Sequence, residues 1–158
     1  MPSLIRERTG MPDVSSSSEY LEEMFKAALL LTGSAEAAEE SVLEGIESWD
    51  TGEAFGASVF HATLKAAISK ALQQGSPGER EISSLRLPDE LSRVLLLPTA
   101  LRFCFVLRSL IGLPRAECSQ LLKLGGDRLD EQCVSAALGL VRMKAEDIAD
   151  AELHSSVA

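Results

Sequence analysis

The chain has 158 residues and a mass of 16.9 kDa, enough for one domain or for two small helical ones. Its 15 basic and 24 acidic residues give a formal net charge of −9, which argues against a protein whose whole surface must hold nucleic acid. Aromatic residues make up only 4% of the chain. Because alanine, leucine and glutamate are abundant, the composition favours helix over strand, and we expect an all-α fold.

The same sequence gives no sign of a membrane or metal-binding protein. No apolar run approaches the roughly 18 residues that a membrane span needs, and the first residues are charged, unlike a signal peptide. We therefore expect a cytoplasmic protein with no membrane partner. Cys104, Cys118 and Cys133 are widely spaced and form no C-x-x-C pair, so we expect buried thiols and neither a disulfide framework nor a zinc site.

Apolar residues at helical spacing predict three helices in the first half of the chain. The first covers residues 18–31, with Gly33 as its expected left-handed terminator. The second covers residues 35–49 and carries an acidic outer face. The third covers residues 54–73 and is followed by a stretch rich in glycine and proline, which is typical of a linker.

Four more helices are predicted in the second half, where prolines open helices and glycines end them. They cover residues 88–97, 98–110, 114–122 and 127–144. The last three, joined by short turns that contain glycine, have the layout of a helix-turn-helix unit.

These predictions divide the chain into five segments and define its expected core. The segments are a disordered N-terminus (1–18), a helical domain (19–74), a linker (75–87), a helix-turn-helix domain (88–145) and an acidic, fraying tail (146–158). The core residues expected from the apolar faces are Leu21, Phe25, Val42, Ile46, Trp49, Phe60 and Leu64, then Leu101, Phe105, Leu110, Leu121, Leu129 and either Cys133 or Val134.

Two stretches resemble the extracytoplasmic-function group of bacterial RNA polymerase sigma factors. Residues 25–44, FKAALLLTGSAEAAEESVLE, look like the family's opening helices, in which a leucine-rich helix ends at Thr-Gly and an Ala-Glu-Asp helix follows. Residues 97–122, LPTALRFCFVLRSLIGLPRAECSQLL, are similar to its promoter-reading domain. They occur in the family's order, and the resemblance covers roughly residues 20–143. It implies two small helical domains, the second a helix-turn-helix.

The resemblance also implies two sets of site residues. The positions that match the family's contact with the polymerase are Glu40, Leu43 and Glu44, with leucine where the family has glutamine. The candidate DNA-binding residues are His61 and Lys65 on the third predicted helix, and Arg115, Lys123, Arg128 and Gln132 in the helix-turn-helix.

The presumed recognition helix departs from the family where the family is basic. Asp130 and Glu131 occupy positions that would face the groove. A carboxylate repels phosphate and can accept a hydrogen bond only from cytosine's amino group in the major groove. Whether promoter DNA is a partner is therefore left open by the sequence.

The sequence leaves three functional hypotheses. The first is a sigma-factor-like transcription regulator that binds the RNA polymerase core and also promoter DNA. The second is a sigma-like module that has lost DNA binding and docks on polymerase or on an anti-sigma protein. The third is a helical scaffold domain. The sequence contains no phosphate loop, nucleophile elbow or Cys/His pair, so we expect no enzyme, no cofactor and no metal.

Overall fold

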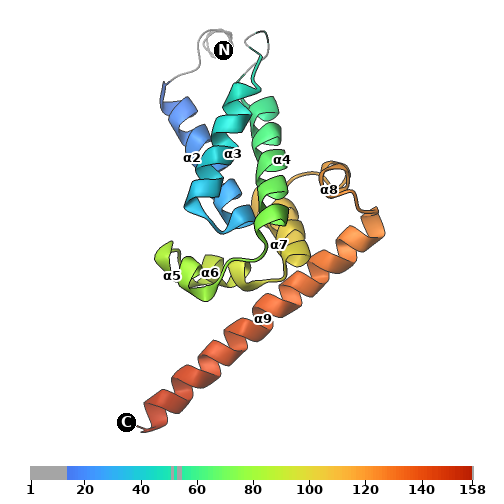
Figure 1. Ribbon diagram of the computed structural model, residues 1–158. Coiled ribbons are helices and arrows are strands. Elements are labelled where there is room, and N and C mark those ends of the chain that lie inside the picture. Colours follow the sequence, from blue (N-terminus) through green and yellow to red (C-terminus); the bar gives the residue numbers. More distant parts are fainter. Residues whose placement is uncertain (1–13, 51, 53–54, 158) are drawn as a thin grey trace, which may run out of the picture.

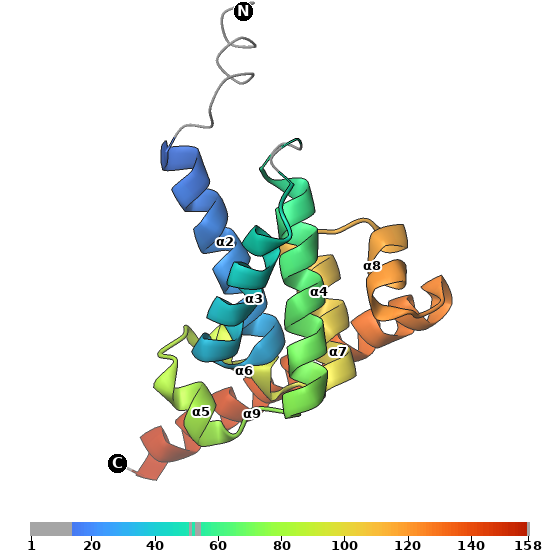
Figure 2. The ribbon, with the colours of Figure 1, turned by 45° about the horizontal axis from the view of Figure 1, so that its top comes forward.

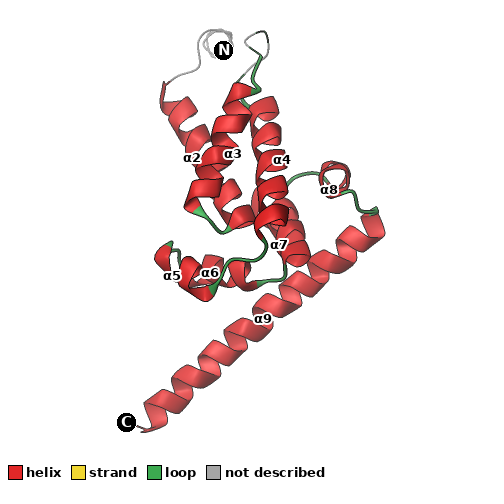
Figure 3. Ribbon diagram, in the orientation of Figure 1, coloured by secondary structure: helices red, strands yellow, loops and turns green. Residues whose placement is uncertain are grey.

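The computed structural model describes residues 14–50, 52 and 55–157. Within these ranges the chain is helical and contains no strand (Figure 3), which confirms the predicted all-α fold class. The predicted disordered segment 1–18 overlaps them only at its end, where a helix begins at Val14, earlier than expected. Residues 1–13 lie outside the described residues.

The first half is a bundle of three helices that pack side by side (Figures 1 and 2). They are α2 (Val14–Thr32), α3 (Ala35–Glu47) and α4 (Ala57–Gln74). Gly33 follows α2 in the left-handed conformation, with φ of 71°, which is the conformation expected of a helix terminator. On α3, a Cβ at Gly45 would collide with the Thr63 side chain of α4, so glycine allows these two helices to approach closely.

The second half is built from shorter helices and one long one. They are α5 (Glu79–Ser84), α6 (Asp89–Leu96), α7 (Thr99–Phe105), the π-helical segment η1 (Val106–Ile111), α8 (Arg115–Leu122) and α9 (Gly126–Val157). Gly112 ends η1 in the left-handed conformation, and the Leu113 amide donates to the Leu107 carbonyl across this turn. The 32-residue α9 crosses beneath the bundle, and its C-terminal end projects away from it (Figure 1).

Two predicted segments differ from the structure, whereas the predicted helix 98–110 is helical from Thr99, first as α7 and then as the π-helical segment η1. The expected linker 75–87 contains helix α5. The expected fraying tail, 146–158, is helical as far as Val157. An ion pair supports this extension, because Arg93 Nε of α6 lies 2.8 Å from Asp147 Oδ2 of α9. The division into separately folding domains, 19–74 and 88–145, stays a prediction.

Two of the expected core residues are exposed. Leu110 is 43% exposed and Val134 is 61% exposed. Leu110 lies in the π-helical segment, whose wider turn rotates the following side chains away from the face expected for a 3.6-residue period. The alternative to Val134, Cys133, is half-buried and donates a hydrogen bond to the Cys104 carbonyl of α7. Leu64 and Leu129 are buried as predicted, and the other expected core residues are half-buried.

One apolar cluster joins the two halves of the molecule. It contains buried residues of α2 and α4 together with buried residues of α6, α7, η1, α8 and α9. At the centre of this junction lies Arg102 of α7, which is fully buried. Its Nη2 donates a 2.9 Å hydrogen bond to the Leu31 carbonyl in the last turn of α2. Burial lowers the pKa of Arg102 from its usual value.

The remaining guanidinium nitrogens of Arg102, Nε and Nη1, have no hydrogen-bond partner within the described ranges. Unpaired buried donors cost free energy, whereas the bond to Leu31 satisfies a carbonyl that the end of α2 leaves open. The guanidinium therefore holds the two halves together at an energetic cost.

Two substitutions separate these contributions. We expect Arg102→Met to change the free energy of unfolding by less than about 1 kcal/mol, or to raise it, because an apolar side chain of similar length removes the unpaired donors. Arg102→Ala should lower it by about 2–4 kcal/mol, since it leaves a void in the junction. Urea denaturation of both variants measures the difference. A loss of several kcal/mol in Arg102→Met, equal to that in Arg102→Ala, would show that the hydrogen bond outweighs the unpaired donors.

Candidate functional site

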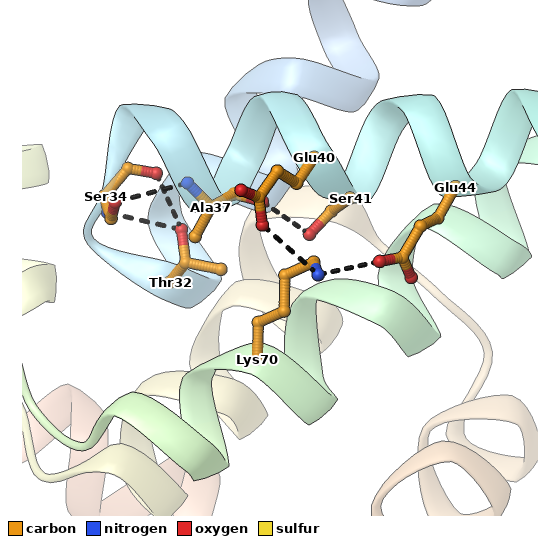
Figure 4. Close-up of polar contacts among 7 residues, drawn as sticks. All are labelled: Thr32, Ser34, Ala37, Glu40, Ser41, Glu44 and Lys70. Carbon is orange, nitrogen blue, oxygen red and sulfur yellow. Dashed lines mark hydrogen bonds and ion pairs between the residues drawn. The ribbon is translucent and has the colours of Figure 1, made fainter.

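The predicted polymerase-contact residues lie together on the outer surface of α3. Glu40, Leu43 and Glu44 are all exposed, and Leu43 shows 51% of its surface. Ser34 caps the N-terminus of α3, because its side chain accepts a hydrogen bond from the Ala37 amide in the first turn (Figure 4). Leu43 therefore lies exposed beside two carboxylates on this surface.

Lys70 of α4 fixes the two glutamates on this surface. Its Nζ lies 2.7 Å from Glu44 Oε1 and 3.4 Å from Glu40 Oε2 (Figure 4). The hydrogen bond to Glu44 is the main cause that raises the pKa of Lys70. Sequence reasoning missed this pairing, since Lys70 is far from both glutamates along the chain and only the packing of α3 on α4 brings it there.

In the second half, Arg115 is held by carboxylates of α9. Its Nη2 lies 2.9 Å from Asp130 Oδ2 and its Nε lies 3.2 Å from Asp130 Oδ1, while Asp127 is 3.5 Å away. These contacts raise the pKa of Arg115, first through the hydrogen bond to Asp130. A Cβ at Gly126 would lie 2.6 Å from the guanidinium carbon, so glycine leaves room for Arg115 against the first turn of α9.

This arrangement changes the meaning of two predicted features. The carboxylate of Asp130, expected to face the DNA groove, neutralises a predicted DNA-binding residue of its own chain. In this conformation Arg115 is engaged in a bidentate pair, which a phosphate would have to displace.

The other predicted DNA-binding residues fall into two groups. Lys65, Lys123 and Gln132 line one cavity between the two halves. His61 and Arg128 lie outside that cavity, both exposed. The structure therefore places three of the six predicted DNA-binding residues in one cavity. The other three, His61, Arg115 and Arg128, lie outside it.

Gln132 is directed toward the interior of the second half. Its Oε1 accepts a hydrogen bond from the Cys104 thiol at 3.1 Å. Burial raises the pKa of Cys104 to about 12 and that of Cys118 to about 11, so both remain neutral thiols at physiological pH. Cys104 and Cys118 are buried as predicted, whereas Cys133 is only half-buried.

Metal-binding clusters and membrane spans are both missing from the described ranges. No group of three or more His, Cys, Asp or Glu side chains is placed there to hold a metal ion. Among the helices of the same ranges, none combines the length and hydropathy that a bilayer span requires.

The fold is similar to that of a sigma factor. The solved structure is the sigma factor RpoE in complex with the anti-sigma factor NepR from Bartonella quintana, with a TM-score of 0.60 at 15% sequence identity. The match covers 83% of this chain and 95% of the other. At this identity the likeness shows a shared fold, which is the sigma-factor-like architecture expected from the sequence. No protein-family model matches the chain, and no curated protein is significantly similar to it.

The Arg115 pair generates a prediction about DNA. We expect Asp130→Asn to remove the bidentate ion pair and leave Arg115 with only the longer contact to Asp127, so that non-specific binding to duplex DNA strengthens. The slope of log K against log salt should steepen by about 0.9, the value for one added phosphate contact. Fluorescence anisotropy with a labelled duplex at several salt concentrations measures both effects.

Glu146→Gln is the matched control, because it removes one exposed negative charge from the same helix, away from Arg115. It should leave the salt slope unchanged. Equal slopes for the two variants would mean that net charge alone, and not the release of Arg115, governs the binding.

Proposed function

We propose that this chain is a sigma-factor-like transcription regulator that binds the core of RNA polymerase through the exposed face of α3. The observation that carries the proposal is the placement of Glu40, Leu43 and Glu44 on one open surface of a sigma-factor-like fold. Such a regulator works in the cytoplasm and needs neither a cofactor nor catalysis.

The ion pairs to Lys70 support this role. Lys70 holds one oxygen of each glutamate, so the carboxylates are oriented before a partner arrives and lose less side-chain entropy on binding. More than half of each glutamate side chain remains exposed. The surface is therefore acidic and preorganised, and it complements a basic partner with an apolar contact for Leu43.

Two of the predicted DNA-binding residues make contacts within the chain. Arg115 is paired with acidic residues of α9, and Gln132 is bonded to Cys104. We propose that the chain in this conformation binds duplex DNA weakly, and that any promoter contact requires Arg115 to exchange Asp130 for phosphate.

The Arg115–Asp130 ion pair and the hydrogen bond between Cys104 and Gln132 also favour a second candidate function, a sigma-like module that has lost DNA binding. Such a module would dock on polymerase or on an anti-sigma protein through the same acidic surface. Support for the second partner is that the structurally similar sigma factor was solved in complex with an anti-sigma factor. The salt dependence of DNA binding separates the two candidates, and binding to polymerase separates the first from a helical scaffold.

One substitution tests the proposed surface. We expect Leu43→Lys to reduce capture of purified core polymerase by about tenfold or more, because it replaces the apolar contact with a charge and cancels negative charge of the surface. The control is Leu96→Lys on α6, an equally exposed leucine at 48%, which should bind like the native chain. Pull-down with quantified polymerase subunits provides the measurement. Equal capture by both variants would remove α3 from the interface.

A further inference from the structure

A cavity of about 560 Å³ lies at the junction of the two halves. Its walls come from α4, from α7, from the end of α8 with the turn after it, and from α9. Its size is within the range of about 300–1,000 Å³ that is usual for small-molecule sites. The interior is mainly apolar and includes Leu72 of α4, Phe103 of α7 and Leu122 of α8.

The polar groups of this cavity are basic or neutral. Lys65 comes from α4 and Lys123 from the left-handed turn after α8. No acidic residue lines the cavity. In the part of the chain that the structure describes, neither lysine forms an ion pair. The lining of this cavity is therefore positively charged, although the chain as a whole has a net charge of −9.

The neighbouring amide adds a hydrogen-bond donor. Gln132 uses its Oε1 to accept from the Cys104 thiol, which fixes the amide plane and leaves the Nε2 group as a donor at the cavity wall. Lys65, Lys123 and Gln132 thus all offer N–H groups, and a ligand that satisfies them must bring acceptor oxygens.

We propose that this cavity binds a small amphipathic anion, specifically a fatty-acid-like carboxylate. Its head group would be held by Lys65 and Lys123 at the exposed rim, and its hydrocarbon tail would cover Leu72, Phe103 and Leu122. The charge complementarity selects an anion, and the apolar walls select a molecule with a hydrocarbon body over a free inorganic anion. The proposal goes beyond the function proposed above and does not depend on it.

A second cavity offers an internal comparison. It has about the same volume, 570 Å³, and is also mainly apolar, but its charged residues are Glu23 and Lys26. One acid and one base leave it without net charge, so it has no reason to prefer an anion. The preference for a carboxylate is therefore expected of the first cavity only.

Binding would connect the ligand to the conformation of the chain. Lys65 belongs to the first half and Lys123 to the second, so a ligand held by both stabilises the packing of the halves as it is seen here. It would also occupy three of the six predicted DNA-binding residues. The ligand would thus favour the arrangement in which those residues are withdrawn from DNA.

The test is isothermal titration of the full chain with decanoate, below the concentration at which it forms micelles. We expect saturable binding of one equivalent. Decan-1-ol has the same tail and no charge. Its affinity should be lower by about tenfold or more, because it lacks the charge-assisted bonds to lysine. Acetate, which has the charge and no tail, should give no saturable binding.

Variants locate the site. Lys65→Gln combined with Lys123→Asn should weaken decanoate binding by about tenfold or more, and asparagine tolerates the left-handed backbone at position 123. Lys26→Gln, in the second cavity, is the matched control and should bind like the native chain. Ala100→Phe, which places a ring into the first cavity, should abolish binding while circular dichroism remains native.

The proposal is overturned if decanoate shows no saturable binding, if decan-1-ol binds as tightly as decanoate, or if the double lysine variant binds like the native chain. None of these measurements involves polymerase or DNA. Their failure would therefore leave the proposed polymerase contact of α3 standing, and loss of that contact would leave the cavity proposal standing.

Discussion

The arrangement of this molecule depends on the meeting of one buried guanidinium with the end of one helix. Arg102 and Leu31 are 71 residues apart in the sequence, so their hydrogen bond ties the second half of the chain to the first. Carbonyls at a helix C-terminus carry partial negative charge and have no partner within the helix. The cationic side chain supplies both a donor and a complementary charge at that point.

Arg102 lies where the later helices meet the three-helix bundle. Its hydrogen bond holds α7 against the end of α2, and the helices after α7 pack on it and on the three-helix bundle within a single apolar cluster. This packing creates the cavity between α4 and α8 and places Lys65 and Lys123 in its walls. The outer face of α3 stays uncovered, so the proposed polymerase contact remains available, while Arg115 of α8 and Gln132 of α9 make contacts inside the chain.

The acidic residues of α3 and Asp130 of α9 therefore have different consequences. On α3, Glu40 and Glu44 are braced by Lys70 and still face solvent, which suits recognition by a basic partner. On α9, Asp130 is paired with Arg115 of the same chain. A screened surface pair of this kind adds little to stability, but it removes a positive charge from the surface that would meet DNA.

Sequence patterns predicted the helical class and most of the helices because each apolar face is a local feature. The failures arise where the decisive partner is distant. Arg102 looks like a surface cation in its local sequence, and only the end of α2 shows why it is buried. Leu110 follows the expected period until the π-helical segment shifts it outward. The candidate site shows the same limit, because the exposed acidic face of α3 could be predicted from spacing alone, whereas the pairing of Arg115 with Asp130 depends on how the turn after α8 folds back.

The central claim is that the two halves form one body closed at Arg102, and a distance between them tests it most directly. Spectroscopic labels on non-natural side chains at positions 36 and 131, on the exposed surfaces of α3 and α9, would leave the cysteines intact. Pulsed electron paramagnetic resonance should then give a single narrow distance distribution in the free protein. A broad distribution spanning many separations would contradict the claim, because it would mean that the halves move independently and that the junction at Arg102 does not hold them.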